Sequence, residues 1–264
     1  QATARRAGYF VDSEERLNVG MVDDVLSCCR VITGSEPKQI IVRGIGPSLA
    51  GSGLPADTIL ADPTLELYQD GTLLLSNDNW KDSQQSEIEA TGIAPTDDFE
   101  SAIVATLDPG SYTVILRGQN SGTGIGLVEA YDLESASQSS LANTSTRGLV
   151  ATGDDVLIGG FIVGNGGSDT VVVRAIGPSL AAVGVANPLA DPTLDLYDVN
   201  GVVLRSDDNW RDSQESLIQS TGLAPTNDAE SAIIRSLAPG SYTAVVRGKD
   251  GGTGVALVEV YNLQ

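Results

Sequence analysis

The chain has 264 residues, 41% of them hydrophobic, which is enough for one large domain or two of ordinary size with a packed core. Its 15 basic and 35 acidic residues give a net charge of −20, which makes nucleic acid and anionic membrane surfaces poor partners. It has no histidine and no apolar run of the roughly 20 residues that span a bilayer, which excludes a Ser-His-Asp triad, histidine-based zinc sites and membrane insertion.

The first thirteen residues, QATARRAGYFVDS, precede the part of the chain that is repeated. Residues 7–11, AGYFV, predict an extra strand that has no assigned place in a domain. A free sheet edge accepts such a strand, either in its own domain or on a neighbouring copy. The sequence opens at Gln1 and not at Met, which we interpret as a secreted protein whose leader has been removed.

Cys28 and Cys29 are the two cysteines, adjacent in a predicted strand. Neighbouring side chains of a strand face opposite ways, so one of the two is expected to be exposed. In an oxidising compartment an exposed cysteine can form a disulfide with another subunit. The alternative is that both are small, unreactive residues.

A repeat covers most of the chain. The stretch that ends in VRGIGPSLA returns roughly 130 residues later ending in VRAIGPSLA, and DPTLELYQDGTLLLSNDNW returns as DPTLDLYDVNGVVLRSDDNW. A period this long indicates a duplicated domain and not a solenoid. We predict a first domain at 1–133 that includes the extra N-terminal strand, a Ser/Thr-rich linker at 134–147 and a second domain at 148–264.

Short β-rich runs such as TLELYQ, TLLLSN, SAIVATL and SYTVILRG predict strands, with QDG and DPG as turns. Residues 82–92, DSQQSEIEATG, predict one short helix, because an Asp/Ser start, helix-forming residues and a closing Gly follow one another. The second copy repeats it as DSQESLIQSTG. The predicted fold class is all-β, with two tandem jelly-roll-like β-sandwich domains, each carrying one short helix.

Arg43 and Arg174 lie inside apolar strand runs at matching positions of the two copies. An arginine in such a place is costly unless it is paired. Glu129 and Glu259, in LVEAY and LVEVY, are the partners that we predict across the sheet.

Acidic and amide side chains gather at the ends of the predicted hairpin. Asp62 precedes its first strand and Asp78 and Asn79 follow its second, so these residues are expected to meet, and Glu100 is expected to approach the same corner. Converging oxygens are the ligands that Ca²⁺ prefers. The alternative is Asx-turn capping of the backbone by the Asp and Asn side chains. The second copy offers Asp191, Asp208, Asn209 and Glu230.

Trp80 and Trp210 are the two tryptophans and occupy matching places. An exposed tryptophan beside a loop can stack on a sugar ring, and a buried one can close the end of the sandwich; both interpretations are open. A glycosidase-like pair of carboxylates is disfavoured, because such acids lie in pockets lined by aromatic residues and this chain has few. We therefore expect a protein that is not an enzyme.

The phrase DPTLELYQDGTLLLSNDNW, followed by LDPGSYTVILRG, resembles the bacterial pre-peptidase C-terminal domain and related modules of secreted bacterial proteins. The likeness covers residues 62–133 and 191–263. It implies a jelly-roll-like sandwich, often calcium-binding, that accompanies enzymes without doing their chemistry. It also implies ion contacts by Asp62, Asp78, Asn79 and their second-copy partners. The short helix and the upstream VRGIGPSLA block depart from the family pattern.

The resulting hypothesis is a secreted, extracellular or cell-surface structural protein. Its copies would dock by strand exchange into a head-to-tail homopolymer, a fibre or surface assembly stabilised by Ca²⁺. The alternative is a polysaccharide-binding or adhesion module that uses the loops around the two tryptophans.

Overall fold

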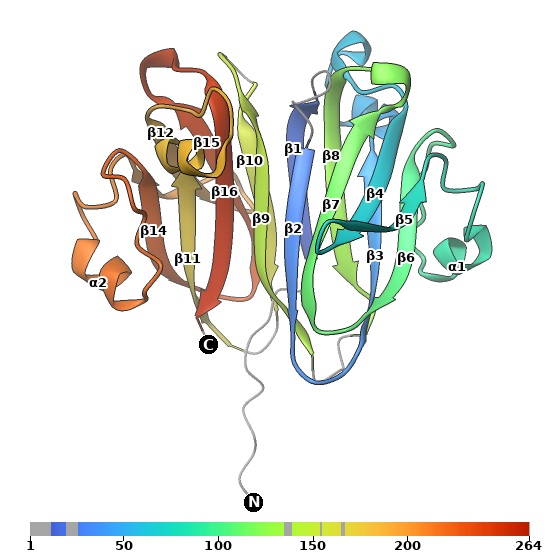
Figure 1. The fold of residues 1–264 in the computed structure, drawn as a ribbon, viewed down its shortest axis with the longest axis horizontal. Coiled ribbons are helices and arrows are strands. Elements are labelled where there is room, and N and C mark those ends of the chain that lie inside the picture. The colour runs from blue at the N-terminus through green and yellow to red at the C-terminus, as the bar shows by residue number, and fades with distance from the viewer. Residues whose placement is uncertain (1–11, 20–25, 135–138, 154, 165–166, 264) are drawn as a thin grey trace, which may run out of the picture. The chain divides into compact units, whose positions relative to one another are not determined.

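The computed structural model describes residues 12–19, 26–134, 139–153, 155–164 and 167–263 (Figure 1). The chain forms two compact units. The first holds Glu14–Ser140 and Thr146–Leu149, and the second holds the described residues before Glu14 together with Leu141–Ser145 and Val150–Gln264. Strands dominate both, and each carries one short α-helix, which confirms the predicted all-β sandwich class. Within the described ranges, no helix has the length and apolar character that crossing a membrane requires.

The first unit pairs its strands in the orders β5-β4-β7-β2 and β6-β3-β8-β1. Its strands are β1 (Asp12–Val19), β2 (Leu26–Thr33), β3 (Lys38–Ile45), β4 (Pro63–Gln69), β5 (Thr72–Asn77), β6 (Ser101–Leu107), β7 (Gly110–Gly118) and β8 (Gly124–Asp132), with helix α1 (Gln85–Ala90) between β5 and β6.

The second unit repeats this plan in the orders β13-β12-β15-β10 and β14-β11-β16-β9. Its strands are β9 (Ser140–Val150), β10 (Leu157–Val163), β11 (Asp169–Ile176), β12 (Pro192–Asp198), β13 (Val203–Asp207), β14 (Ser231–Leu237), β15 (Gly240–Gly248) and β16 (Gly254–Leu263), with helix α2 (Glu215–Ser220) between β13 and β14. Strand by strand, the two units correspond, which confirms the duplication that the repeat predicts.

The hairpin of β4 and β5 is built as the sequence indicates. Asp70 and Gly71 form its turn with φ of 49° and 78°, the left-handed backbone that an Asp-Gly pair supplies in tight hairpins. The antiparallel register places Leu65 opposite Asn77. Asp62, just before β4, and Asp78, just after β5, therefore lie at the same end of the hairpin.

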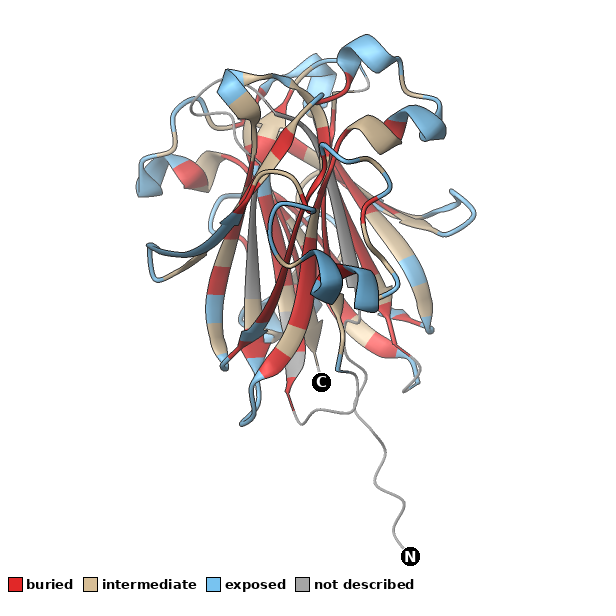
Figure 2. Cartoon of the chain, turned by 90° about the vertical axis from the view of Figure 1, so that its right-hand side faces the viewer, coloured by how far each residue is buried: buried red, intermediate tan, exposed pale blue. Residues whose placement is uncertain are grey.

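Burial follows the strand period (Figure 2). In β4, Leu65 and Leu67 are fully buried while their neighbours face partly outward, the alternation of a strand with one wet face. Strand β3 is buried along nearly its whole length, because its outer side is covered as well: Ile41 packs with Trp80 and with Ile88 of α1. The short helix thus acts as a lid over one sheet.

The predicted arginine pairs are present in both units. Arg43 is in register with Glu129 on the neighbouring strand and forms an ion pair with it, and Arg174 does the same with Glu259. The second guanidinium nitrogen of Arg43 donates to the carbonyl of Ile93 at 2.7 Å, which ties the loop after α1 to the sheet. Each of these arginine contacts is to another group of the same unit, so the role of the arginines is structural.

The stretch predicted as a linker contains a strand. Residues 140–147 belong to β9, which pairs with β16, and its hydroxyl residues Thr144, Ser145 and Thr146 are buried. A Ser/Thr-rich composition is typical of linkers, but threonine is also β-branched and fits a strand when a partner strand is available. The extra strand predicted at 7–11 lies outside the described residues.

Candidate functional site

Asp62, Asp78 and Asn79, which we call the first corner, lie together as the hairpin predicts. The backbone N–H of Gln119 donates to the carbonyl of Asp62 at 2.8 Å, and its side-chain Nε2 donates to Oδ2 of Asp78 at 2.6 Å. Burial and then the nearby charge of Asp78 raise the pKa of Asp62, so the two carboxylates repel each other.

Three oxygens of the first corner are buried without a hydrogen-bond donor: Oδ1 of Asp62, Oδ1 of Asp78 and Oδ1 of Asn79. Buried polar atoms are satisfied in most folded proteins, so an orphaned group of acceptors calls for a cation or donor. Two carboxylates and an amide carbonyl are hard oxygen ligands of the kind that Ca²⁺ binds. Within the described residues, no group of three or more His, Cys, Asp or Glu side chains could hold a metal ion. The first corner therefore offers two carboxylates and one amide carbonyl as ligands.

The second corner, formed by Asp191, Asp208 and Asn209, contains a cation of its own. Lys249 occupies the position of Gln119, and its Nζ lies 2.6 Å from Oδ2 of Asp208 and 3.6 Å from Oδ2 of Asp191. The hydrogen bond to Asp208 raises the pKa of Lys249, which keeps the ammonium charged. The two corners therefore share a geometry and differ in charge by the substitution of one residue.

Glu100 does not join the first corner. Its carboxylate is fully buried and accepts three hydrogen bonds from another loop, to Oε1 from Gly46 N at 3.1 Å and Ser48 N at 2.9 Å and to Oε2 from Ser48 Oγ at 2.8 Å. A fourth comes from its own loop, where Asp97 N donates to Oε2 at 3.3 Å. Glu230 repeats this pattern with the backbone N–H groups of Gly177, Ser179 and Asn227. Donors already occupy both oxygens, so neither carboxylate joins its corner, and the prediction of Glu100 and Glu230 as calcium ligands stays a prediction that this geometry does not support.

The same carboxylate explains the repeated GIGPSL and AIGPSL runs. A Cβ on Gly46 would lie 2.2 Å from the carbonyl oxygen of Leu60, so only glycine allows the loop to pass there. Pro47, which has no N–H, begins a 3-10 helix over Pro47–Ser52, and the N–H groups on either side of it reach Glu100. The motif therefore fixes its loop to the buried carboxylate of Glu100.

Both tryptophans are buried, which excludes them as stacking platforms for a sugar. Trp80 is 6% exposed and Trp210 is 2% exposed, and their indole N–H groups donate to the backbone carbonyls of Asp97 at 3.0 Å and Asn227 at 3.1 Å. The structure thus supports the alternative of a tryptophan lid.

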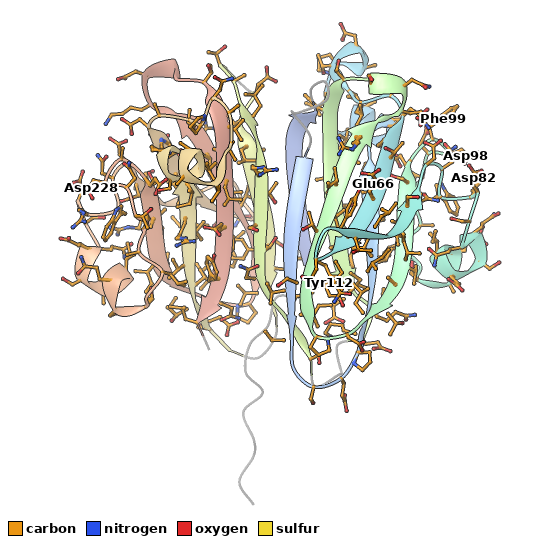
Figure 3. All side chains as sticks on the ribbon, in the orientation of Figure 1. Glu66, Asp82, Asp98, Phe99, Tyr112 and Asp228 are labelled. Atoms are coloured by element: carbon orange, nitrogen blue, oxygen red, sulfur yellow. The ribbon has the colours of Figure 1, made fainter. Side chains whose placement is uncertain are left out.

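A cation covers the ring of each tryptophan. Lys81 lies over Trp80 at 5.1 Å from its centroid, and Arg211 over Trp210 at 4.5 Å. These cations are paired in turn with Asp98 and Asp228, whose side chains project from the outer loops (Figure 3).

Cys28 and Cys29 lie in β2, opposite Val114 and Thr113 of β7. Their side chains are outside the described part of the structure. An intermolecular disulfide through either residue stays a prediction.

Gln84 and Gln214 are structural residues that the sequence analysis missed. Oε1 of Gln84 accepts from the N–H of Val104 at 3.2 Å and its Nε2 donates to the carbonyl of Val104 at 2.8 Å, so one amide completes the outer edge of β6 as a neighbouring strand would. Gln214 does the same for Ile234 of β14. The available signal was a glutamine kept at the same place before both short helices.

Asp207 gives a stability prediction because the first unit has Asn77 in its place. Burial raises the pKa of Asp207, although its Oδ2 accepts from Ala232 N at 2.9 Å. Asn77 accepts the equivalent bond from Ala102 N at 2.9 Å without carrying a charge. The folded state therefore holds the Asp207 proton more tightly than the unfolded state does. As the pH rises from the pKa of an unfolded aspartate to the higher pKa of folded Asp207, the free energy of unfolding falls, and it stays lower at higher pH.

We therefore expect Asp207→Asn to raise the free energy of unfolding at pH 7 by about 1 kcal/mol. We also expect it to remove the pH dependence of the free energy of unfolding that Asp207 causes at acidic pH. Urea unfolding at pH 4 and pH 7 measures both effects. The reverse change, Asn77→Asp, should lower stability at pH 7. A variant Asp207→Asn that is less stable than wild type at pH 7 would show that the charge is needed.

No family model and no curated protein matches this sequence. Among solved structures, the chain is similar to the pre-peptidase C-terminal domain of collagenase from Bacillus anthracis, with 16% identity, a TM-score of 0.30 and coverage of 45% of this chain and 89% of that one. It is also similar to the major capsid protein P2 of bacteriophage PM2, with 11% identity, a TM-score of 0.23 and coverage of 95% and 98%.

A third similar structure is the tandem CBM51 modules of a family 98 glycoside hydrolase from Streptococcus pneumoniae, with 8% identity, a TM-score of 0.26 and coverage of 89% of this chain and 84% of that one. At these values the likenesses carry no argument about the fold, a ligand or an activity.

Proposed function

We propose that this chain is a secreted, non-enzymatic structural module whose copies associate outside the cell into a fibre or surface layer. The proposal rests on the observation that the polar residues repeated in both units make hydrogen bonds inside the protein. Glu100, Glu230, Gln84 and Gln214 make the same internal hydrogen bonds in both units, where they anchor loops and complete strand edges. The two units thus share the residues that hold the fold together.

The polysaccharide-binding alternative loses the residues on which it depended, since Trp80 and Trp210 are buried and covered by cations. We therefore keep self-association as the proposal to be tested first.

Electron microscopy of the purified full chain tests this function directly. We expect polymers from the intact chain and single particles from a chain that lacks residues 1–11, because the strand-like N-terminal run is then missing and β1 is kept whole. Polymers that survive this deletion unchanged would defeat docking by that segment. Circular dichroism of both chains provides the control for folding.

We also propose that Ca²⁺ stabilises the first unit. The support is the first corner, where Oδ1 of Asp62, Asp78 and Asn79 have no donor and no lysine offsets the repulsion between the two carboxylates. In the second corner Oδ1 of Asp191 and Asp208 also have no donor, but Lys249 supplies a positive charge. Asp62, Asp78 and Asn79 would hold the ion, which would supply the positive charge that Lys249 supplies to the second corner.

Thermal unfolding with Ca²⁺ and with a chelator measures this effect. An ion that binds only the folded state at 100 times its dissociation constant adds about 2.7 kcal/mol, so chelation should lower the melting temperature. Gln119→Lys should abolish the response, because it places an ammonium in the first corner as Lys249 does in the second.

The matched control is Lys249→Gln, which should create a second calcium response while lowering stability in the chelator. Identical melts of the wild-type chain in Ca²⁺ and in chelator would reject the calcium proposal. The self-association proposal does not depend on this result.

A further inference from the structure

Strands β5 and β6 of the first unit and β13 and β14 of the second each stand first in their strand order and have a hydrogen-bonded neighbour on one side alone. An edge strand presents unpaired N–H and C=O groups that accept a further strand, and proteins protect such edges with charges or covering groups. Strand β6 is protected by side chains, since Asn77 accepts from Ala102 N at 2.9 Å and Gln84 bonds both backbone groups of Val104.

The second unit protects both of its edges. On β14, Asp207 and Gln214 take the places of Asn77 and Gln84. On β13, Nη1 of Arg235 donates to the carbonyl of Leu204 at 2.8 Å, and Arg205 puts a charge in the strand itself and donates to Ser213 Oγ at 2.8 Å. These arginines block the approach of another strand.

Strand β5 has a bulge against its neighbouring strand, as β13 has, but it lacks the arginines that protect β13. Leu75 stands where β13 has Arg205, and Ala105 stands where β14 has Arg235. Thr72–Asn77 contains no charged residue, and Leu73, Leu74 and Leu75 are 48%, 41% and 39% exposed. Among the hydrogen bonds of the described residues, no side chain bonds to the backbone of β5, which lies at the end of its sheet beside β4 (Figure 1).

We propose that β5 of the first unit is the edge on which a second copy of this chain docks, through residues Ala7–Val11 of that copy. This inference rests on the proposed function and names the surface that it uses. The run AGYFV is uncharged and apolar, as β5 is, and nearly equals β5 in length. Backbone pairing along the edge and leucine contacts would hold it.

Charge favours the same occupant. Arg5 and Arg6 precede the run in a chain of net charge −20, and Asp70 and Asp78 flank the two ends of β5. Whichever direction the incoming strand takes, the arginine pair comes next to an aspartate at one end. A second β5, with the same two aspartates at its ends, would meet like charges.

The variant Leu75→Arg tests the edge. It gives β5 the residue that β13 has, so the fold accepts it, and we expect the dissociation constant of the assembly to rise roughly tenfold or more. Sedimentation velocity measures the association, and an unchanged melting temperature confirms folding. The matched control, Arg205→Leu, removes protection from β13 and should not weaken association.

A mixing experiment tests the occupant. A chain without residues 1–11 keeps β5, and Leu75→Arg keeps the N-terminal run, so each alone should be monomeric and the two together should form a one-to-one dimer. A mixture that stays monomeric would overturn the proposal, as would a truncated chain that still associates, because β5 would then pair with another β5.

The two proposals fail in different ways. Polymers of the wild-type chain that persist in Leu75→Arg would overturn β5 as the docking edge and leave self-association standing. A wild-type chain that is monomeric at every concentration would overturn both.

Discussion

Glu100→Ala is expected to destabilise the first unit by about 3–5 kcal/mol, because several neutral donors lose their shared acceptor at once. The substitution leaves the N–H groups of Gly46, Ser48 and Asp97 without their acceptor in the interior. Each buried donor that loses its partner costs about 1–3 kcal/mol. Urea unfolding followed by circular dichroism measures the loss.

The second unit and an exposed residue provide matched controls. Glu230→Ala should cost about as much as Glu100→Ala, because the contacts of the two carboxylates are the same. Glu89→Ala, on the exposed face of α1, should change stability by less than about 0.5 kcal/mol. If Glu100→Ala unfolds at the wild-type urea concentration and instead loses a calcium response, Glu100 is a metal ligand after all.

Trp80→Ala and Trp210→Ala should each destabilise their unit by about 3–5 kcal/mol, the range for removing a large aromatic side chain from a core. Trp80 packs against Ile41 and Ile88, and Trp210 packs against Ile218. Each change also removes an indole N–H that donates to a loop carbonyl. The urea midpoint reports the effect.

Phenylalanine separates the two contributions of each tryptophan. Trp80→Phe keeps most of the packing and loses the hydrogen bond to Asp97, so its cost should fall to about 1–3 kcal/mol. An alanine variant that keeps wild-type stability but loses binding to a polysaccharide would show that the tryptophan is a binding residue and not a lid.

The sequence alone predicted those features that depend on local pattern. The Asp-Gly turn fixed the hairpin of β4 and β5, and with it the meeting of Asp62 and Asp78. The arginine inside an apolar run required a partner, and Glu129 was found in register with Arg43. In each case a strong physical constraint acts between residues whose relation is set by one turn or one strand pair.

Other features could not be predicted, because they depend on contacts between residues that lie far apart in the sequence. Glu100 is placed near the end of the hairpin, since its carbonyl accepts from Trp80 N at 2.8 Å, but its side chain turns to a loop more than 50 residues earlier. Strand β9 has the composition of a linker and forms because a partner strand is available. The exchange of Gln119 for Lys249 was visible between the copies, yet its meaning appears only when the lysine meets two aspartates.

Sedimentation velocity of the purified full chain over a range of concentrations tests self-association most directly. We predict species larger than the 27.3 kDa monomer that grow with concentration and that disappear when residues 1–11 are removed. A single 27.3 kDa species at every concentration would contradict it.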